Sequence, residues 1–155
     1  LRAGWMVSRD RDILFKALVL REDTSEIMNV MGEYIASAAL EPARYESLMA
    51  AALEDGRRCW PIIEEWVEKR EWLEWVKPQA GYLCFVKYHL DIPSDEFHAR
   101  LLAPPYRTLV HPGSAYNEEH HIRLGIGGGD DDKIRGGLEQ IDRFVADLRK
   151  TGPAR

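Results

Sequence analysis

The sequence predicts an α/β fold with an α+β-like small domain, in which a sheet of a few strands is covered by a long helix and a C-terminal helix. Two observations carry this prediction. Apolar residues recur every three or four positions through 43–71 and again through 130–148, as in amphipathic helices. Short aromatic and β-branched segments lie between them, bounded by Pro and Gly. The chain has 155 residues, 45% of them hydrophobic, which is enough for one core.

The first 42 residues are predicted to form one strand and two helices. Alternating apolar residues predict a strand from Leu1 to Ser8, after which a helix is capped by the following acidic residues. The polar segment 21–25 should end that helix, and a second one should run from about Glu26 to Pro42. No second strand is predicted here, so these residues look like part of another domain. A chain that opens inside a strand pattern suggests a fragment.

The remainder is predicted to alternate helices with short strands. Residues 43–71 should form one long helix kinked near Pro61, or two helices with a break there, because Gly56 and Pro61 disfavour a helix interior. Strands are expected at 73–76, 82–88, 108–110 and 121–126, and helices at 94–102 and 130–148. The tryptophans of 60–75 are expected to pack the long helix onto the sheet.

Composition excludes several classes of protein. The net charge of −5 argues against a general nucleic-acid binder, because a phosphate backbone requires excess Lys and Arg. No apolar segment has the length of a membrane span and no secretory signal pattern opens the chain, so we expect a cytoplasmic protein. Cys59 and Cys84 form no CxxC pair, and buried thiols in a reducing compartment are expected.

Several local patterns do not support a site. The Gly127–Gly129 segment lacks the lysine and hydroxyl of a phosphate loop, and three aspartates follow it. His120 and His121 are adjacent, so in a strand they would face opposite sides, and no metal site is predicted. The GxSxG pattern of α/β-hydrolases is also missing from the sequence.

Two arginines are stronger candidates. Arg2 and Arg123 each lie within an apolar strand pattern, where an unpaired guanidinium is rare. A guanidinium in that setting can bind a carboxylate or phosphate through two parallel hydrogen bonds. The alternative is an ion pair with an acid of the same chain.

Several segments, taken in order, resemble class I and II aminotransferases, the fold type I enzymes that depend on pyridoxal 5'-phosphate (PLP). Residues 1–5 (Leu-Arg-Ala-Gly-Trp) resemble the family's Gly-Leu-Arg-x-Gly-Trp, and residues 77–82 its Pro-x-Gly-Gly-Phe turn. Residues 110–116 are similar to Val-x-Pro-Gly-x-x-Phe, and residues 121–125 to the Ile-Arg-Leu strand. The helix from Asp130 resembles the family's closing helix. The resemblance covers nearly the whole chain, which corresponds to the C-terminal portion of the family's fold.

By this resemblance, Arg2 binds the cofactor phosphate, Arg123 binds the substrate α-carboxylate and Tyr116 lies near the substrate. Residues 1–42 correspond to the end of the large cofactor-binding domain, 43–150 to the small C-terminal domain and 151–155 to a tail. The implied reaction transfers an amino group between an amino acid and a 2-oxo acid, in a homodimer that includes an N-terminal large domain. The family's Schiff-base lysine falls before Leu1, so no catalytic residue is assigned and the chain alone should be inactive.

Two other functions remain open at this stage. The chain also resembles the effector domain of those bacterial transcription regulators that join a winged helix-turn-helix to an aminotransferase-like domain. A basic DNA-binding segment upstream would distinguish this case. A third possibility is a non-catalytic binding module that folds as a monomer.

Overall fold

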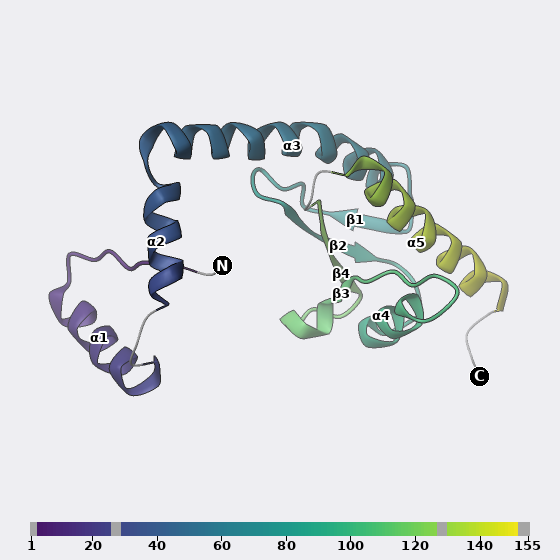
Figure 1. Cartoon of the computed structure of the whole chain (residues 1–155). Helices are drawn as coiled ribbons and strands as arrows, with labels where there is room; N and C mark the ends of the chain where they lie inside the picture. The colour runs from purple at the N-terminus through teal and green to yellow at the C-terminus, as the bar shows by residue number, and fades with distance from the viewer. Residues whose placement is uncertain (1–2, 26–28, 127–129, 152–155) are drawn as a thin grey trace. The chain divides into compact units, whose positions relative to one another are not determined.

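The computed structural model describes residues 3–25, 29–126 and 130–151 (Figure 1). The chain divides into two compact units, one up to Ala51 and one from Ala52 onward. Arg2 and the Gly127–Gly129 segment lie outside the described residues.

The N-terminal unit contains two complete helices, the first residues of a third helix and no strand among its described residues. Helix α1 spans Arg11–Ser25 and begins where Asp10 accepts hydrogen bonds from the amides of Asp12 and Ile13. Helix α2 spans Val30–Ala39, and its N-cap Asn29 accepts from the amide of Gly32. Two predictions were wrong here. Residues 3–8 form no strand, because no neighbouring strand pairs with their backbone, and the polar segment 21–25 continues α1.

Helix α3 spans Pro42–Glu68 as one helix, which confirms the long helix and not the pair with a break. It begins at Pro42, where the missing amide hydrogen costs nothing because the first turn has no acceptors for it. Pro61 lies inside the helix, immediately before the apolar face formed by Ile62, Ile63, Trp66 and Val67. Burial of that face outweighs the unfavourable proline.

A four-stranded antiparallel sheet forms the centre of the second unit. Its order is β1-β2-β4-β3, with β1 at Leu73–Trp75, β2 at Leu83–Tyr88, β3 at His111–Pro112 and β4 at His121–Gly125. The strand predicted at 108–110 was wrong: the pairing begins at His111. The amide of Thr108 instead donates to Leu101 of helix α4, so this segment follows the helix before it joins the sheet.

Three further helical segments complete the unit. Helix α4 spans Ser94–Leu102, the 3-10 helix η1 spans Gly113–Tyr116 and helix α5 spans Asp131–Thr151. The side chain of Asp130 accepts from the amide of Lys133 at the start of α5. The predicted helices at 94–102 and 130–148 are therefore confirmed.

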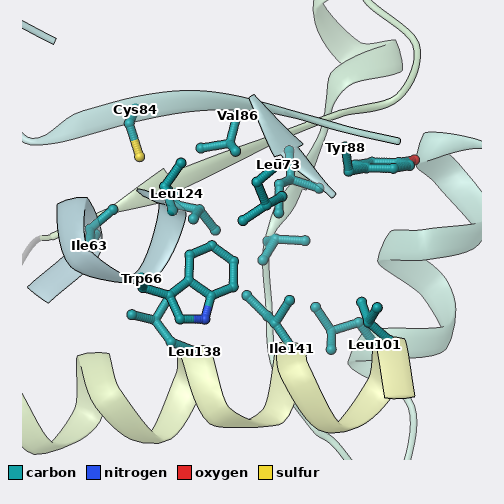
Figure 2. Close-up of a cluster of buried hydrophobic side chains, with 14 of the residues drawn as sticks. Ile63, Trp66, Leu73, Cys84, Val86, Tyr88, Leu101, Leu124, Leu138 and Ile141 are labelled. Atoms are coloured by element: carbon teal, nitrogen blue, oxygen red, sulfur yellow. The ribbon is translucent and has the colours of Figure 1, made fainter. Parts of the chain in front are cut away.

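The core lies between one face of the sheet and the helices α3, α4 and α5. Figure 2 shows Cys84, Val86 and Leu124 of the sheet facing Trp66 of α3 and Leu138 and Ile141 of α5. The tryptophans pack as predicted: Trp66 and Trp72 are buried and meet edge to face at 5.9 Å. Both cysteines are buried and free, as predicted. Within the described ranges, no helix is long and apolar enough to cross a membrane.

Candidate functional site

The candidate site lies on the face of the sheet opposite the core. Successive side chains of a strand point to opposite faces, and the buried residues of β4 are Ile122 and Leu124. Arg123 therefore points away from the core, as does Phe85 of β2, which is its direct cross-strand partner. The antiparallel pairing of β2 and β4 thus places an arginine and an aromatic ring side by side on a rigid support.

Arg123 has no acid partner among the residues that the structure describes. Within the described residues its guanidinium forms no hydrogen bond or ion pair, and its contact is the ring of Tyr116, whose centroid lies 5.3 Å from Cζ. Arg70, the other half-buried arginine among the described residues, behaves differently because it is paired with Asp142. A half-buried guanidinium without an acid partner retains its hydrogen-bond donors for an external anion.

Tyr116 is held by the short helix η1. Gly113 opens η1 in close contact with the chain beyond it, because an added Cβ there would lie 2.0 Å from the carbonyl oxygen of Glu118. Asn117 closes η1 in the left-handed region with φ 59°. The hydroxyl of Ser114 donates to Asp95 at 2.6 Å, which ties η1 to the first turn of α4. These contacts fix the backbone that carries the Tyr116 ring.

Two further rings extend the contact between Arg123 and Tyr116. The ring of Phe85 meets the ring of Tyr116 edge to face, with 5.6 Å between the ring centroids. It stacks on the His121 ring, with 4.7 Å between the centroids and an interplanar angle of 9°. His121 is anchored in turn by a 2.7 Å hydrogen bond between its Nδ1 and the carbonyl of Glu119. Arg123, Tyr116, Phe85 and His121 are called the aromatic–arginine cluster below. Its apolar surroundings strengthen any hydrogen bond between the guanidinium and an anion.

A polar network fixes the start of β4 beneath this cluster. The carboxylate of Glu119 accepts from the amide of Ser94 at 2.9 Å, and this hydrogen bond lowers the Glu119 pKa from its usual value. The Tyr88 hydroxyl donates to the carbonyl of Ile92 at 2.9 Å, and burial raises the Tyr88 pKa to about 12. The amide of Tyr88 donates to the carbonyl of His120, whose φ of 57° turns the chain into β4.

Arg123 also borders an open cavity of about 820 Å³. The cavity is lined by the segment 106–111, the end of β4, the first turns of α5, Leu83 of β2 and the core residue Ile63 of α3. Its volume is in the range of cavities that bind small organic ligands.

The described residues do not by themselves form a site for PLP. Four described lysines are paired with carboxylates: Lys69 with Glu65, Lys77 with Glu64, Lys133 with Asp130 and Lys150 with Asp147. The two others, Lys16 and Lys87, are exposed. In the described part of the chain, no three His, Cys, Asp or Glu side chains are grouped to hold a metal ion.

The sequence predictions for the site differ in outcome. Arg123 and Tyr116 are brought together, while the role of Arg2 stays a prediction because Arg2 lies outside the described residues. Sequence reasoning did not select Phe85 and treated His121 only as a rejected metal ligand. Strand parity was the available signal, because Phe85 alternates with the buried Cys84 and Val86.

Comparisons with known proteins find solved structures that are similar to this chain. No protein-family model matches the sequence, and no curated protein sequence matches it. A PLP-dependent aminotransferase from Streptococcus suis 89-1591 is 24% identical, with a TM-score of 0.75 over 88% of this chain and 34% of its own. The PLP-dependent cyclase OrfR is 24% identical, with a TM-score of 0.75 over 88% of this chain and 37% of its own. Pyrococcus horikoshii kynurenine aminotransferase, solved with PMP, is 20% identical, with a TM-score of 0.73 over 88% of this chain and 35% of its own.

The chain therefore spans about a third of the length of these enzymes. Identities of this size establish the fold alone, and the cyclase shows that one fold serves more than one reaction. The predicted fold class is confirmed: the protein shares the mixed α/β fold of part of a fold type I PLP-dependent aminotransferase.

Proposed function

We propose that this chain is the C-terminal part of a PLP-dependent aminotransferase, in which Arg123 binds the α-carboxylate of an amino acid or 2-oxo acid substrate. One observation carries the proposal: among the described residues, the half-buried guanidinium of Arg123 has an aromatic neighbour and no acid partner. A guanidinium that is carried by a paired strand and has no acid partner keeps its N–H donors for an anion from outside.

The guanidinium of Arg123 and a substrate carboxylate have complementary chemistry. A guanidinium presents parallel N–H donors that match the two oxygens of a carboxylate, so it fixes orientation as well as position. Because Arg123 stands on a paired strand and not on a loop, a bound carboxylate would be held at a defined point. Residues 110–116, which carry Tyr116, would form one wall beside the bound substrate.

In this proposal the chain supplies only part of the enzyme. Residues 1–42 are the end of the large domain, 43–150 the small domain and 151–155 a tail, and Arg2 binds the cofactor phosphate. PLP supplies the electron-withdrawing chemistry at the substrate α-carbon. In the proposed intact enzyme the large domain holds PLP, so we expect this chain alone to form no stable covalent adduct with PLP and to be inactive.

Exposed apolar residues of the first unit support this division. Helix α1 has no buried residue and the only one described in α2 is Gly32. Phe15, Leu20, Met31 and Tyr34 are each exposed by more than 60% of their surface. Such surfaces normally pack against other protein. The large domain and a second subunit of a cytoplasmic homodimer would cover them.

The experiment titrates the isotope-labelled chain with pyruvate and follows the arginine Nε–Hε resonances by NMR. We expect the Arg123 resonance to move to saturation. Arg123→Gln should weaken binding roughly tenfold or more, because hydrogen bonds between charged groups contribute about 1.5–3 kcal/mol.

Two controls make this test specific. Methyl pyruvate has no carboxylate and should not move the resonance. Arg149→Gln removes an exposed arginine near the end of α5 and should leave pyruvate binding unchanged. If Arg123→Gln binds pyruvate as well as the unchanged chain does, the proposed role of Arg123 is wrong.

A further inference from the structure

We propose that Tyr116 is a positioning residue for Arg123, with its ring face holding the guanidinium in place and Phe85 supporting that ring. The inference rests on the proposed function, because it concerns how the carboxylate-binding arginine is held before substrate arrives. It adds a reason why the guanidinium can be held in place without an acid partner.

The geometry of the contact explains how this works. The guanidinium carbon of Arg123 lies 5.3 Å from the centroid of the Tyr116 ring, within the range of a cation–π interaction. In a stacked cation–π contact the guanidinium uses its flat face, and its N–H donors, which lie in its plane, stay unused. A carboxylate of the same chain would occupy those donors. An aromatic ring therefore orients the cation and leaves its donors for substrate.

The Tyr116 ring also has a second contact, with the ring of Phe85. Phe85 meets it at 5.6 Å with an interplanar angle of 75°, and Phe85 is the cross-strand partner of Arg123. The sheet thus fixes both the cation and the ring that supports Tyr116. His121 stacks on Phe85 at 4.7 Å and limits its movement in turn.

A purely structural role for Tyr116 fits less well. Its side chain is 42% exposed and lies outside the buried core. Its hydroxyl forms no hydrogen bond with any residue in the described part of the chain. The ring, and not the hydroxyl, is therefore the part of Tyr116 with a defined contact. This distinction predicts that Phe can replace Tyr116 and that an aliphatic residue cannot.

The experiment compares Tyr116→Phe, Tyr116→Leu and Phe85→Leu with the unchanged chain in the pyruvate titration. Tyr116→Phe should bind within about twofold of the unchanged chain, because the ring remains. Tyr116→Leu should bind roughly three- to tenfold more weakly, the range expected for a cation–π interaction at a partly exposed position. Phe85→Leu should have a smaller effect in the same direction.

A spectroscopic readout separates positioning from folding. A guanidinium above a ring face is shielded, so the Arg123 Nε–Hε proton should resonate upfield in the unchanged chain and in Tyr116→Phe. It should move to the ordinary position in Tyr116→Leu, while the resonance of Arg149 stays unchanged. This shift is measured without ligand and in folded protein, which the dispersion of the remaining amide spectrum verifies.

The outcomes separate the two proposals. If Arg123→Gln abolishes pyruvate binding but Tyr116→Leu changes neither affinity nor the Arg123 resonance, the positioning role is wrong and the proposed function stands. If Arg123→Gln has no effect on pyruvate binding, the proposed function fails and the positioning role fails with it. A Tyr116→Phe variant as weak as Tyr116→Leu would assign the effect to the hydroxyl and overturn the inference.

Discussion

Replacing Gly113 by Ala should destabilise the second unit and displace η1. An added Cβ would lie 2.0 Å from the carbonyl oxygen of Glu118, 2.7 Å from Cβ of His121 and 2.8 Å from its carbonyl oxygen. Two of these three atoms belong to the backbone and cannot rotate away. The shortest contact must lengthen to at least 3.0 Å, so η1 has to move away from the start of β4.

The cost follows from what that movement breaks. Overpacking of this kind costs about 1–3 kcal/mol. The 3.1 Å hydrogen bond from the amide of Glu118 to the carbonyl of Gly113 would also be strained, which adds about 1 kcal/mol. We therefore expect a loss of about 2–4 kcal/mol in the free energy of unfolding. A loss of about 2 kcal/mol corresponds to a decrease of about 8–16 °C in Tm for a unit of this size.

The assay is thermal and urea unfolding followed by tryptophan fluorescence, since Trp66 and Trp72 are buried in the same unit. The matched control is Gly136→Ala in α5, where an added Cβ has no atom within 4 Å. That change should stabilise the protein by about 0.5–1 kcal/mol, because Ala favours the helix more than Gly does. If Gly113→Ala unfolds at the same temperature as the unchanged chain, the close approach of η1 to β4 is refuted.

Three further predictions concern the core and its polar contacts. Asp142→Asn should lower the free energy of unfolding by about 1–2 kcal/mol in urea titrations, because it removes the half-buried partner of Arg70; an unchanged midpoint would mean that solvent screens the pair. Cys59 and Cys84 should resist a thiol reagent at mildly alkaline pH until the chain is denatured, since burial raises the pKa of both and that of Cys84 to about 12; rapid labelling of the folded chain would contradict this. The lowered pKa of Glu119 gives stability that is present above the usual value of 4.5 and is lost as pH falls through the lowered pKa. Glu119→Gln should therefore make the free energy of unfolding depend less on pH in acid. An unaltered pH dependence would refute the contribution of Glu119 to stability.

Much of the fold could be predicted because helix periodicity is local. The stripe of Ile134, Leu138 and Ile141 indicated α5, and the structure packs it against the sheet. The long helix through Pro61 was harder, because propensity alone gives two alternatives there. Burial of the face that follows Pro61 decided for a single helix, and burial depends on the partner and not on the local sequence.

Strand predictions succeeded only where a partner strand exists. The segments at 82–88 and 121–126 became β2 and β4, which pair with each other. The alternation of residues 3–8 is of the same kind, yet these residues form no strand in this chain. A strand is stable only when another strand satisfies its backbone hydrogen bonds, and that requirement is not written in its own residues.

By itself, the sequence indicated the α-helices, the strands β1, β2 and β4, and Arg123 as an arginine within an apolar strand pattern. Each of these depends on residue type and on spacing along the chain. Only the tertiary structure decided that Arg123 has a ring and no acid beside it among the described residues. That outcome depends on which of many acids and rings the fold brings within reach, and contacts between residues distant in sequence arise from the packing of the whole unit.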